Sequence, residues 1–394
     1  MGEHNKRIIA VFTGNRAEYG LQYPIIRAIE YDERVDYRLI VAGAHLKGEF
    51  GDTLDEIRQD RFVVHCEIEV DLEADHIYST ASAIGSGIMR VSEVLKSMEP
   101  DILVVYADRF EGFAALIAGT QMGIPTAHVE GGDYTDGGAL DDSVRHAMTK
   151  LAHIHFTTNS SAKGRVLAMG EEPWRVHDVG YPTIDLIKEG NFSAPEEIYS
   201  LLNLDGKLPI LAFTQHSVTT EFSEASQQIR SSLIALETAG NRWGVQSVIT
   251  YPNNDAGGRS IIEEIKLFEK KKLPFIRVIE NLGRYRYHGL LNVSDICIGN
   301  SSSGIKETAA FKCPCINIGS RQRGRMRAEN VIDVGYESDE IIDAIETCMK
   351  DSVFLANVAA CNNPYGDGNT GSKIVNVLAT VDLDKKLVQK KMMY

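Results

Sequence analysis

Short apolar runs alternate with longer stretches of helical periodicity along almost the whole chain. The runs that read as strands are 7–12, 37–42, 102–106, 125–129, 154–158, 209–214, 246–251, 275–279, 295–299, 314–318 and 331–334. The stretches that read as helices are 21–31, 76–98, 110–121, 142–152, 222–240, 258–271, 304–311 and 371–380. This alternation is typical of parallel sheets with helices on both faces. The sequence therefore predicts an α/β fold of doubly wound sheets.

The chain length favours two domains. Its 394 residues exceed the roughly 250–300 residues at which a single core stops growing. Tyr-Pro, Gly-Asn and Ser-Ala-Pro-Glu punctuate residues 181–208 before a new apolar run begins. We therefore predict a Rossmann-like N-terminal domain over 1–185, a Rossmann-like C-terminal domain over 186–365 and a helical tail over 366–394. Two such domains are expected to face each other across a cleft that holds the ligand.

Charge and hydropathy exclude several classes of partner. A net charge of −14 argues against nucleic acid and against anionic membranes, because neither polyanion is attracted to the protein as a whole. No apolar run approaches the ~20 residues of a membrane span, so we expect a cytoplasmic protein. The six cysteines are scattered without zinc-site spacing. We expect them to be reduced core residues, and we expect no metal site.

Three acidic residues follow apolar runs in the first half. Asp108 comes just after 102–106, Glu130 comes directly after 125–129, and Asp141 lies beyond a glycine-rich turn. The carboxyl ends of parallel strands are where such sheets bind ligands. Acids without metal-ligand spacing suggest proton transfer, and Arg145, four residues after Asp141, has the spacing for an ion pair. The alternative is that Asp141 or its neighbour only caps a helix.

The second half carries a nucleotide-binding pattern. The run 295–299 leads into Asn-Ser-Ser-Ser-Gly and then into a helical stretch. A strand, a small-residue turn and a helix start expose N–H groups that suit a pyrophosphate, with Ser301 and Ser302 as added donors. Glu307, about one turn into the expected helix, is placed to accept hydrogen bonds from ribose hydroxyls. An ordinary helix cap is the alternative.

Four more side chains stand where a phosphate-bearing ligand would meet them. His216 and Asn253 follow the first two strands of the second domain, and Arg321 begins a basic run. Arg16 lies in the first strand-to-helix loop, which has neither the Gly-x-Gly-x-x-Gly nor the Walker pattern, so its guanidinium is a candidate phosphate partner. The alternatives are a structural histidine, a surface ion pair for Arg16 and a solvated basic loop.

Taken in order, these residues resemble the UDP-N-acetylglucosamine 2-epimerase family, and specifically its hydrolysing branch, over roughly residues 8–380. The motifs that carry the resemblance are Gly14-Asn-Arg-Ala-Glu-Tyr, Asp108-Arg-Phe, His128-Val-Glu-Gly-Gly, Asp141-Asp-Ser-Val-Arg-His, Gln215-His-Ser-Val-Thr-Thr, Gly299-Asn-Ser-Ser-Ser-Gly, Ile318-Gly-Ser-Arg-Gln and Arg325. The resemblance implies a glycosyltransferase-B type fold, a UDP-sugar substrate, a homodimer or homotetramer, no cofactor and no metal.

The resemblance also implies roles for the candidate residues. Catalysis is expected from Asp108, Glu130, Asp141 and His216, and substrate binding from Arg16, Arg109, Arg145, Asn253, Ser301, Ser302, Glu307 and Arg321. The implied reaction releases N-acetylmannosamine and UDP, at the start of sialic acid synthesis, by elimination to a 2-acetamidoglucal and hydration. The alternative substrate is UDP-2,4-diacetamido-2,4,6-trideoxyglucose of legionaminic acid synthesis. A retaining glycosyltransferase and a non-catalytic nucleotide-sugar sensor are the remaining alternatives.

Overall fold

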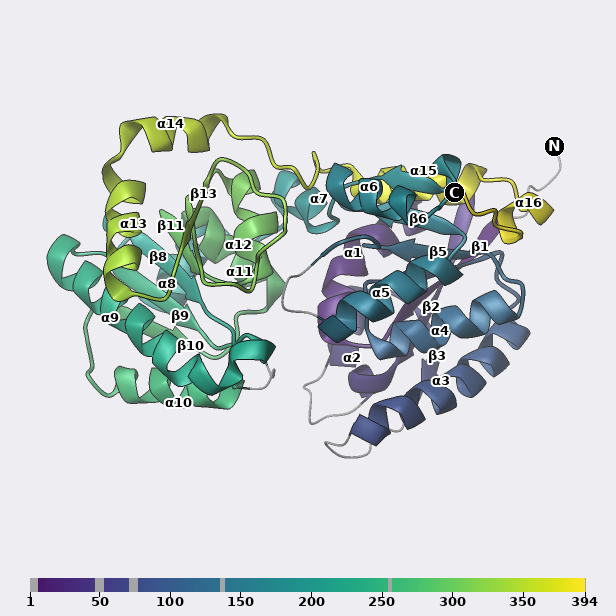
Figure 1. Ribbon diagram of the computed structural model, residues 1–394, viewed down its shortest axis with the longest axis horizontal. Coiled ribbons are helices and arrows are strands. Elements are labelled where there is room, and N and C mark those ends of the chain that lie inside the picture. The colour runs from purple at the N-terminus through teal and green to yellow at the C-terminus, as the bar shows by residue number, and fades with distance from the viewer. Residues whose placement is uncertain (1–5, 47–52, 71–76, 135–138, 254–256, 394) are drawn as a thin grey trace. The chain divides into compact units, whose positions relative to one another are not determined.

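The computed structural model describes residues 6–46, 53–70, 77–134, 139–253 and 257–393, and the side chains of Arg16 and Asp141 lie outside the described part. The chain forms two compact units. Unit 1 comprises Met1–Asp133, Leu140–Asp185 and Gly366–Tyr394, and unit 2 comprises Tyr134–Ala139 and Leu186–Tyr365. Each unit is built around a parallel sheet with helices on both faces (Figure 1). The predicted α/β fold of doubly wound sheets is confirmed.

Unit 1 contains a seven-stranded sheet of order β3-β2-β1-β4-β5-β6-β7. Its strands are β1 Arg7–Thr13, β2 Val35–Ala42, β3 Val64–Ile68, β4 Ile102–Tyr106, β5 Thr126–Val129, β6 Ile154–Thr157 and β7 Val176–Asp178. Its helices are α1 Arg16–Tyr31, η1 Gly43–Leu46, α2 Thr53–Gln59, α3 Ile77–Met98, α4 Phe110–Gln121, α5 Ala139–Leu151, α6 Ser160–Ala168, η3 Pro173–Arg175, α7 Thr183–Lys188, α15 Thr370–Thr380 and α16 Lys385–Val388. The two edge strands, β3 and β7, are absent from the sequence prediction.

Unit 2 contains a six-stranded sheet of order β10-β9-β8-β11-β12-β13. Its strands are β8 Ile210–Thr214, β9 Gln246–Thr250, β10 Ile276–Ile279, β11 Ile296–Gly299, β12 Cys315–Ile318 and β13 Val331–Val334. Its helices are α8 Pro195–Leu202, η4 Thr219–Glu224, α9 Ala225–Trp243, α10 Gly258–Glu269, α11 Gly283–Val293, α12 Ser302–Lys306, η5 Thr308–Phe311, α13 Ser338–Lys350 and α14 Ser352–Ala360. Numbered within the unit, this order is 3-2-1-4-5-6, that of the dinucleotide-binding fold.

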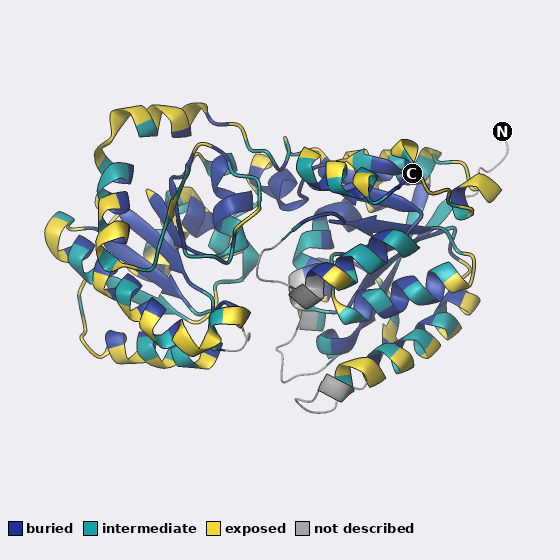
Figure 2. Cartoon of the chain, viewed as in Figure 1, coloured by how far each residue is buried: buried dark blue, intermediate teal, exposed yellow. Residues whose placement is uncertain are grey.

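The strands are apolar on both faces because each sheet is covered on both faces. In β1, Ile9 and Val11 enter one hydrophobic cluster, whereas Ala10 and Phe12 enter another on the opposite face. All four side chains are buried, and the central strands form the dark interior of each unit (Figure 2). The period-two alternation of a strand therefore builds two cores from one apolar run.

Both sheets reverse their strand order next to their first strand. In unit 1 the reversal falls between β1 and β4, and in unit 2 it falls between β8 and β11. Ligands of open α/β sheets bind outside the carboxyl ends of the strands at such a reversal. The loops that begin at Gly14 and Ala107 flank this point in unit 1, and those that begin at Gln215 and Asn300 flank it in unit 2.

The chain returns to unit 1 after unit 2. Helix α15 packs against α1, and its Ile374, Val375 and Leu378 belong to a core cluster of the first sheet. The Asp185 carboxylate accepts hydrogen bonds from the N–H groups of Thr370 and Gly371 at 2.9 and 2.7 Å, which caps the first turn of α15. The amphipathic stretch predicted over 371–380 is therefore a structural part of unit 1.

Two sequence expectations need correction. The helix expected over 304–311 is two short helices, α12 and η5, which meet at Glu307. The helix expected over 142–152 begins at Ala139, so Asp142 lies inside its first turn and does not cap it. In both cases the residues near the boundary are all compatible with a helix, so the sequence does not show where the helix begins or ends. Backbone hydrogen bonds and caps determine that position.

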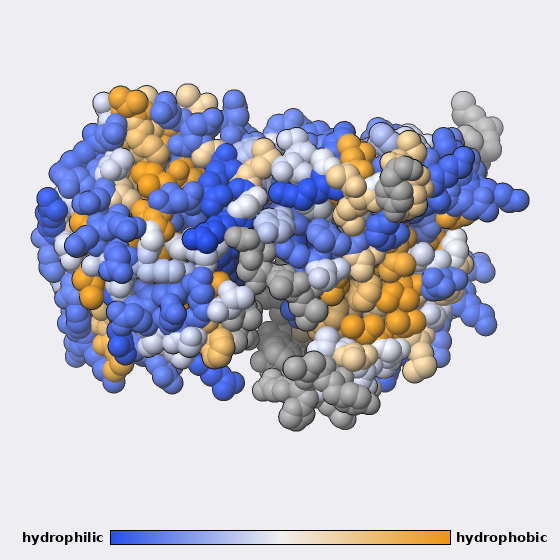
Figure 3. All heavy atoms as spheres, viewed as in Figure 1, coloured by the Kyte–Doolittle hydropathy of each residue, from blue (hydrophilic) through white to orange (hydrophobic). Residues whose placement is uncertain are grey.

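The surface visible in the space-filling view is largely hydrophilic, and its main apolar area lies on unit 1 over helices α3 to α5 (Figure 3). Among the described residues, no helix is long and apolar enough to cross a membrane.

Candidate functional site

The ends of β4 and β5 hold two residues in a conformation that non-glycine residues rarely adopt. Ala107 has φ 54° and Glu130 has φ 69°, and the two strands pair in parallel. The His128 Nε2 atom lies 2.6 Å from the carbonyl oxygen of Ala107, which ties the end of β5 to the end of β4. Left-handed backbone at non-glycine residues costs roughly 1–3 kcal/mol and clusters at functional sites. The surrounding contacts hold Glu130 at this turn.

The two glycines after Glu130 are dictated by close packing. Gly132 has φ 76°, and a Cβ atom there would lie 2.4 Å from the backbone oxygen of Ala162. A Cβ atom at Gly131 would lie 3.0 Å from the His128 ring. The Glu-Gly-Gly sequence therefore lets the chain turn sharply behind the carboxylate, against the start of α6.

Arg145 joins the acidic residues of this region. Its Nη2 atom donates to Asp108 Oδ2, and its Nη1 atom donates to Asp142 Oδ1 at 2.5 Å and to the Asp133 carbonyl oxygen at 3.0 Å. The Arg145 side chain is 8% exposed, and those of Asp108 and Asp142 are 15% and 12% exposed. A planar guanidinium with several donors in fixed directions suits this role. The arrangement fixes Asp108 relative to the first turn of α5.

Four carboxylates surround the Arg145 guanidinium. Burial lowers the pKa of Arg145, but Asp108, Glu130, Asp133 and Asp142 together outweigh that effect and raise it. Arg145 therefore stays charged, and the acids around it interact with a fixed positive charge. Asp142 and Asp133 were not predicted from the sequence as members of this group; the signal for Asp142 was its i, i+3 spacing to Arg145.

Glu130 also lies beside Tyr106, the last residue of β4. Burial, followed by the charge of Glu130, raises the pKa of Tyr106 well above its ordinary value. The phenol therefore remains a neutral group next to the carboxylate throughout the physiological range. Asp108 and Glu130 thus gather in one largely buried acidic centre at the carboxyl ends of neighbouring strands, around Arg145.

In unit 2 the ends of the neighbouring parallel strands β8 and β11 approach each other closely. Gly299 has φ 133°, and a Cβ atom there would lie 1.9 Å from the backbone oxygen of Thr214. The next residue, Asn300, is buried, donates through Nδ2 to the His216 carbonyl oxygen at 2.8 Å and accepts from the His216 N–H at 2.6 Å. The two loops at the strand reversal are therefore locked together through one amide side chain.

His216 is held in a defined protonation state. Its Nδ1 atom accepts a hydrogen bond from the Asn253 N–H at 3.0 Å. Burial, followed by the charge of Arg321, lowers the pKa of His216 to about 3. The neutral ring therefore carries its proton on Nε2, which is then a donor for an anionic or carbonyl oxygen.

The basic run that begins at Arg321 forms hydrogen bonds with the loop that follows β11. Arg321 Nη1 and Gln322 Nε2 donate to the Asn300 carbonyl oxygen at 3.2 and 2.8 Å. Ser301 is the N-cap of α12, and its hydroxyl oxygen accepts from the Ser303 N–H at 3.4 Å. Arg321, Ser301, Ser302 and His216 thus come together at the carboxyl ends of β8, β11 and β12, which is the ligand edge of this sheet.

Glu307 is buried where α12 ends, and it faces a histidine that the sequence prediction missed. Its Oε2 atom lies 3.3 Å from Nε2 of His288, which comes from α11. Both side chains are almost fully buried, at 6% and 3% exposed. His288 therefore restricts the orientation of the Glu307 carboxylate.

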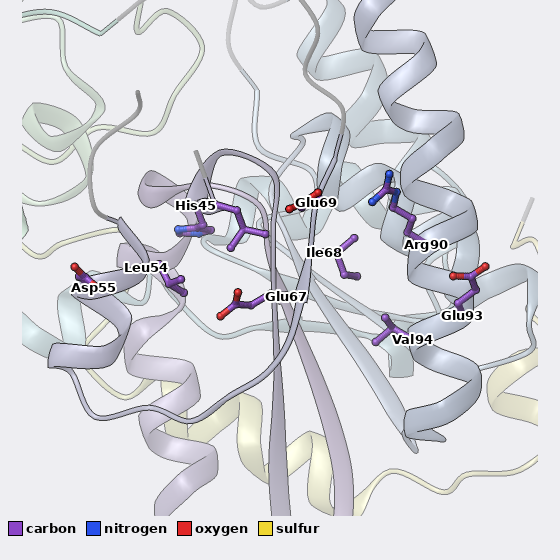
Figure 4. Close-up of a pocket in the computed structure, with 10 residues that line it drawn as sticks. His45, Leu54, Asp55, Glu67, Ile68, Glu69, Arg90, Glu93 and Val94 are labelled. Carbon is purple, nitrogen blue, oxygen red and sulfur yellow. The ribbon is translucent and has the colours of Figure 1, made fainter. Parts of the chain in front are cut away.

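Unit 1 also contains a cavity of about 690 Å³ at the carboxyl ends of β2 and β3 (Figure 4). His45, Glu67, Glu69 and Arg90 are among its lining residues. None of the predicted site residues lines this cavity.

Two predicted residues, Arg16 and Asp141, have side chains outside the described part of the structure, although their backbones start α1 and lie in the first turn of α5. Arg109 precedes α4, and its Nε atom lies 3.6 Å from the Glu111 carboxylate. Within the described ranges, no group of three or more His, Cys, Asp or Glu side chains is arranged to hold a metal ion.

These features define a class: two Rossmann-like units of the glycosyltransferase-B type, one with an acidic centre and one with a nucleotide-type strand reversal. A sequence model of the UDP-N-acetylglucosamine 2-epimerase family matches residues 27–379. The chain belongs to this family, as its motifs predicted.

Individual relatives agree with this assignment. The chain is 35% identical over 384 residues, 98% of each chain, to the UDP-N,N'-diacetylbacillosamine 2-epimerase (hydrolyzing) of Legionella pneumophila. It is 32% identical over 381 residues, 96% of this chain and 97% of the relative, to the GDP/UDP-N,N'-diacetylbacillosamine 2-epimerase (hydrolyzing) of Campylobacter jejuni. The structure of UDP-GlcNAc 2-epimerase from Neisseria meningitidis bound to UDP-GlcNAc matches the fold with a TM-score of 0.78 and 19% identity, over 94% of this chain and 99% of that one.

Proposed function

We propose that this enzyme is a hydrolysing UDP-sugar 2-epimerase and that its substrate is UDP-2,4-diacetamido-2,4,6-trideoxyglucose, the UDP derivative of N,N'-diacetylbacillosamine. The two relatives described above, which are aligned over nearly their whole length, are named as epimerases of this sugar. This substrate was the alternative in the sequence analysis, and UDP-N-acetylglucosamine, which gives the family its description, becomes the second candidate.

The observation that carries the proposal is the acidic centre around Arg145. In the proposed reaction, UDP leaves from C1 while a base removes the proton from C2, which gives the C1=C2 glycal of the 2,4-diacetamido-2,4,6-trideoxy sugar. Water then adds its oxygen to C1, and C2 receives a proton on the opposite face. The product is the free sugar with inverted C2, together with UDP.

The reaction needs carboxylates for two physical reasons. The C2–H bond is barely acidic until the C1–O bond begins to break and the ring gains positive charge. Fixed carboxylates stabilise that charge, and one of them takes the proton. Asp108 and Glu130, which are largely buried at the strand ends, are placed for these roles, and we assign Asp141 to the same group. Arg145 orients Asp108.

As the C1–O bond breaks, negative charge develops on the diphosphate oxygen of the departing UDP. In unit 2, the Nε2 proton of neutral His216, the Arg321 guanidinium and the hydroxyl groups of Ser301 and Ser302 are the proposed partners of the diphosphate. Glu307 is the proposed partner of the ribose hydroxyls, and Asn253 holds His216. We assign Arg16 and Arg109 to the phosphates as well.

The oligomeric state belongs to the same proposal. The apolar area over α3 to α5 fits a contact between copies of the chain, because exposed apolar areas often mark protein interfaces. We propose a homodimer or homotetramer and a cytoplasmic location.

A direct comparison of substrates tests the proposal. The enzyme is incubated separately with the diacetamido-trideoxy UDP-sugar and with UDP-N-acetylglucosamine, and initial rates of UDP release are measured with the free sugar identified by NMR. We expect kcat/KM to favour the first sugar by at least about tenfold. A preference for UDP-N-acetylglucosamine assigns the second candidate, and release of UDP with retention at C2 removes the epimerase function.

A further inference from the structure

Two buried glutamates of unit 1 lie beside the loops that follow β1 and β2, and they are not part of the acidic centre around Arg145. Glu18 is in the first turn of α1, and Glu111 is in the first turn of α4. Each residue is only 2% exposed. Burial of a carboxylate is costly unless it is paired or protonated, so two buried neighbours need a physical explanation.

Glu111 occupies space that two glycines leave empty. A Cβ atom at Gly14 would lie 2.6 Å from the Glu111 Cβ, and one at Gly43 would lie 3.2 Å from its Cγ. Gly14 follows β1, Gly43 follows β2, and Glu111 lies five residues after β4. The Glu111 side chain therefore packs against the loops at three adjacent strand ends.

Few donors reach the two carboxyl groups. Glu18 Oε2 accepts from the Gly14 N–H at 2.7 Å, but Glu18 Oε1 and both oxygens of Glu111 are buried without a hydrogen-bond partner among the described residues. Within the described part of the chain, the cation of this group is Arg109, whose Nε atom lies 3.6 Å from Glu111 Oε2 and whose side chain is 54% exposed. One partly solvated cation balances one carboxylate, not two.

The other charged groups that face the pair among the described residues do not supply the missing positive charge. Asp108 adds a like charge to Glu18. His45 from η1 is neutral near pH 7, because burial lowers its pKa to about 4. Burial, followed by the charge of Glu111, raises the pKa of Glu18 to about 8, and burial also raises the pKa of Glu111.

We propose that Glu18 and Glu111 share one proton at neutral pH and that the singly charged pair positions Arg109 and the Gly14 loop for the substrate. Both are positioning residues. With one proton the pair has a net charge of −1, which Arg109 balances while its guanidinium stays at the surface. Loss of this shared proton leaves two buried negative charges, which draw Arg109 inward and repel an incoming diphosphate. The part that concerns substrate rests on the proposed function.

Infrared spectroscopy tests the shared proton without any substrate. The wild-type enzyme is expected to show the carbonyl band of a protonated carboxylic acid at neutral pH, lost with a midpoint near pH 8. The band is expected to be missing from the Glu18→Gln/Glu111→Gln double variant. In Glu111→Gln, the midpoint of Glu18 falls because the neighbouring like charge is gone. A matched control is Glu264→Gln in unit 2, which leaves the band in place; the Glu264 side chain is 13% exposed and pairs with the exposed Arg230.

Kinetics test the positioning role. In the wild type, KM for the UDP-sugar is expected to rise by about threefold or more per pH unit above pH 8, with a smaller change in kcat, as for a single titrating group. Glu18→Gln and Glu111→Gln are expected to remove this rise. If either variant does not fold, the other carries the test. Absence of the infrared band overturns the shared proton whatever the substrate proves to be, and a KM rise that persists in the variants overturns the positioning role.

Discussion

Arg145 on α5 donates a hydrogen bond to Asp108 beyond the end of β4, although the two residues are 37 positions apart in the sequence. The same guanidinium donates to Asp142, which lies in the first turn of its own helix. One cation therefore sets the distance between a strand end and a helix start. The acids of this region are pre-organised by that cation before any substrate is bound, which is how electrostatic catalysis avoids reorganisation during the reaction.

Replacing Asp108 with Asn is expected to lower kcat by about 10²–10⁴, because the amide keeps the shape but neither takes a proton nor stabilises a cation. The Kd for UDP, measured by calorimetry, is expected to change by less than about threefold, since Asp108 is not among the residues proposed to contact UDP. Glu130→Gln is expected to behave in the same way. Near-normal turnover in both variants removes these carboxylates from the mechanism.

Arg145→Met is expected to lower the free energy of unfolding by about 3–5 kcal/mol, because it leaves the carboxylates of Asp108 and Asp142 without their buried partner. Urea unfolding monitored by circular dichroism measures the change. The matched control is Arg242→Met, whose ion pair with Glu346 spans 3.7 Å between side chains 55% and 35% exposed. The control is expected to cost at most about 1 kcal/mol. Equal effects in the two variants contradict the role given to Arg145.

Gly299→Ala is expected to abolish UDP binding and to destabilise unit 2, because its Cβ atom would lie 1.9 Å from the Thr214 carbonyl oxygen. Gly244→Ala is the matched control: this glycine also has a positive φ, 68°, but a Cβ atom there meets nothing within 4 Å. The control is expected to lose only about 1 kcal/mol from backbone strain. Titration with UDP and thermal unfolding distinguish the two. Intact UDP binding in Gly299→Ala shows that the close approach of the ends of β8 and β11 is not needed for binding UDP.

Lys390 connects the C-terminal segment to the end of α5. Its Nζ atom donates to the carbonyl oxygens of Thr149, Lys150 and Ala152 at 3.2, 3.0 and 2.6 Å and pairs with Glu171 at 2.7 Å. Lys390→Met is expected to lower the free energy of unfolding by roughly 1–3 kcal/mol, the range for hydrogen bonds to a charged group. Lys373→Met, which removes an exposed pair with Asp367, is expected to have little effect.

The Lys390 variant also has a pH signature. Burial raises the pKa of Glu171, but hydrogen bonds from His155, Lys150 and Lys390 outweigh it and lower the pKa to about 2. A depressed carboxyl pKa stabilises the folded state above the ordinary pKa of 4.5, and this contribution is lost as the pH falls toward 2. The wild type should therefore lose more stability than Lys390→Met between about pH 5 and pH 3, as measured by urea unfolding. An equal loss in both contradicts the linkage of Glu171 to Lys390.

The central strands could be predicted because burial on both faces makes them continuous apolar runs. The edge strands β3 and β7 could not. Val64–Ile68 alternates polar with apolar residues, because His65 and Glu67 lie on an exposed face of this edge strand, and Val176–Asp178 is only three residues long. Sequence periodicity detects burial, and edge strands are incompletely buried.

Candidate site residues could be predicted where a polar side chain directly follows a strand. They could not be predicted where the contact is with a residue from a distant part of the sequence. Asp108, Glu130, His216 and Ser301 were proposed by that rule, and the structure places them at the carboxyl ends of strands. Glu111 resembles an ordinary acidic residue in the first turn of a helix, and nothing local marks its contact with Gly14 and Gly43. His288 meets Glu307 only because α11 packs there. Such pairs depend on tertiary contacts that no local pattern contains.

The most direct measurement is the reaction of the diacetamido-trideoxy UDP-sugar in D₂O, followed by NMR. The account predicts free UDP and a free sugar of inverted C2 configuration with one deuterium at C2, because the proton removed in the elimination is replaced from solvent. A released sugar that keeps its C2 proton contradicts the elimination, and deuterium in a UDP-sugar that is never cleaved contradicts the hydrolysis.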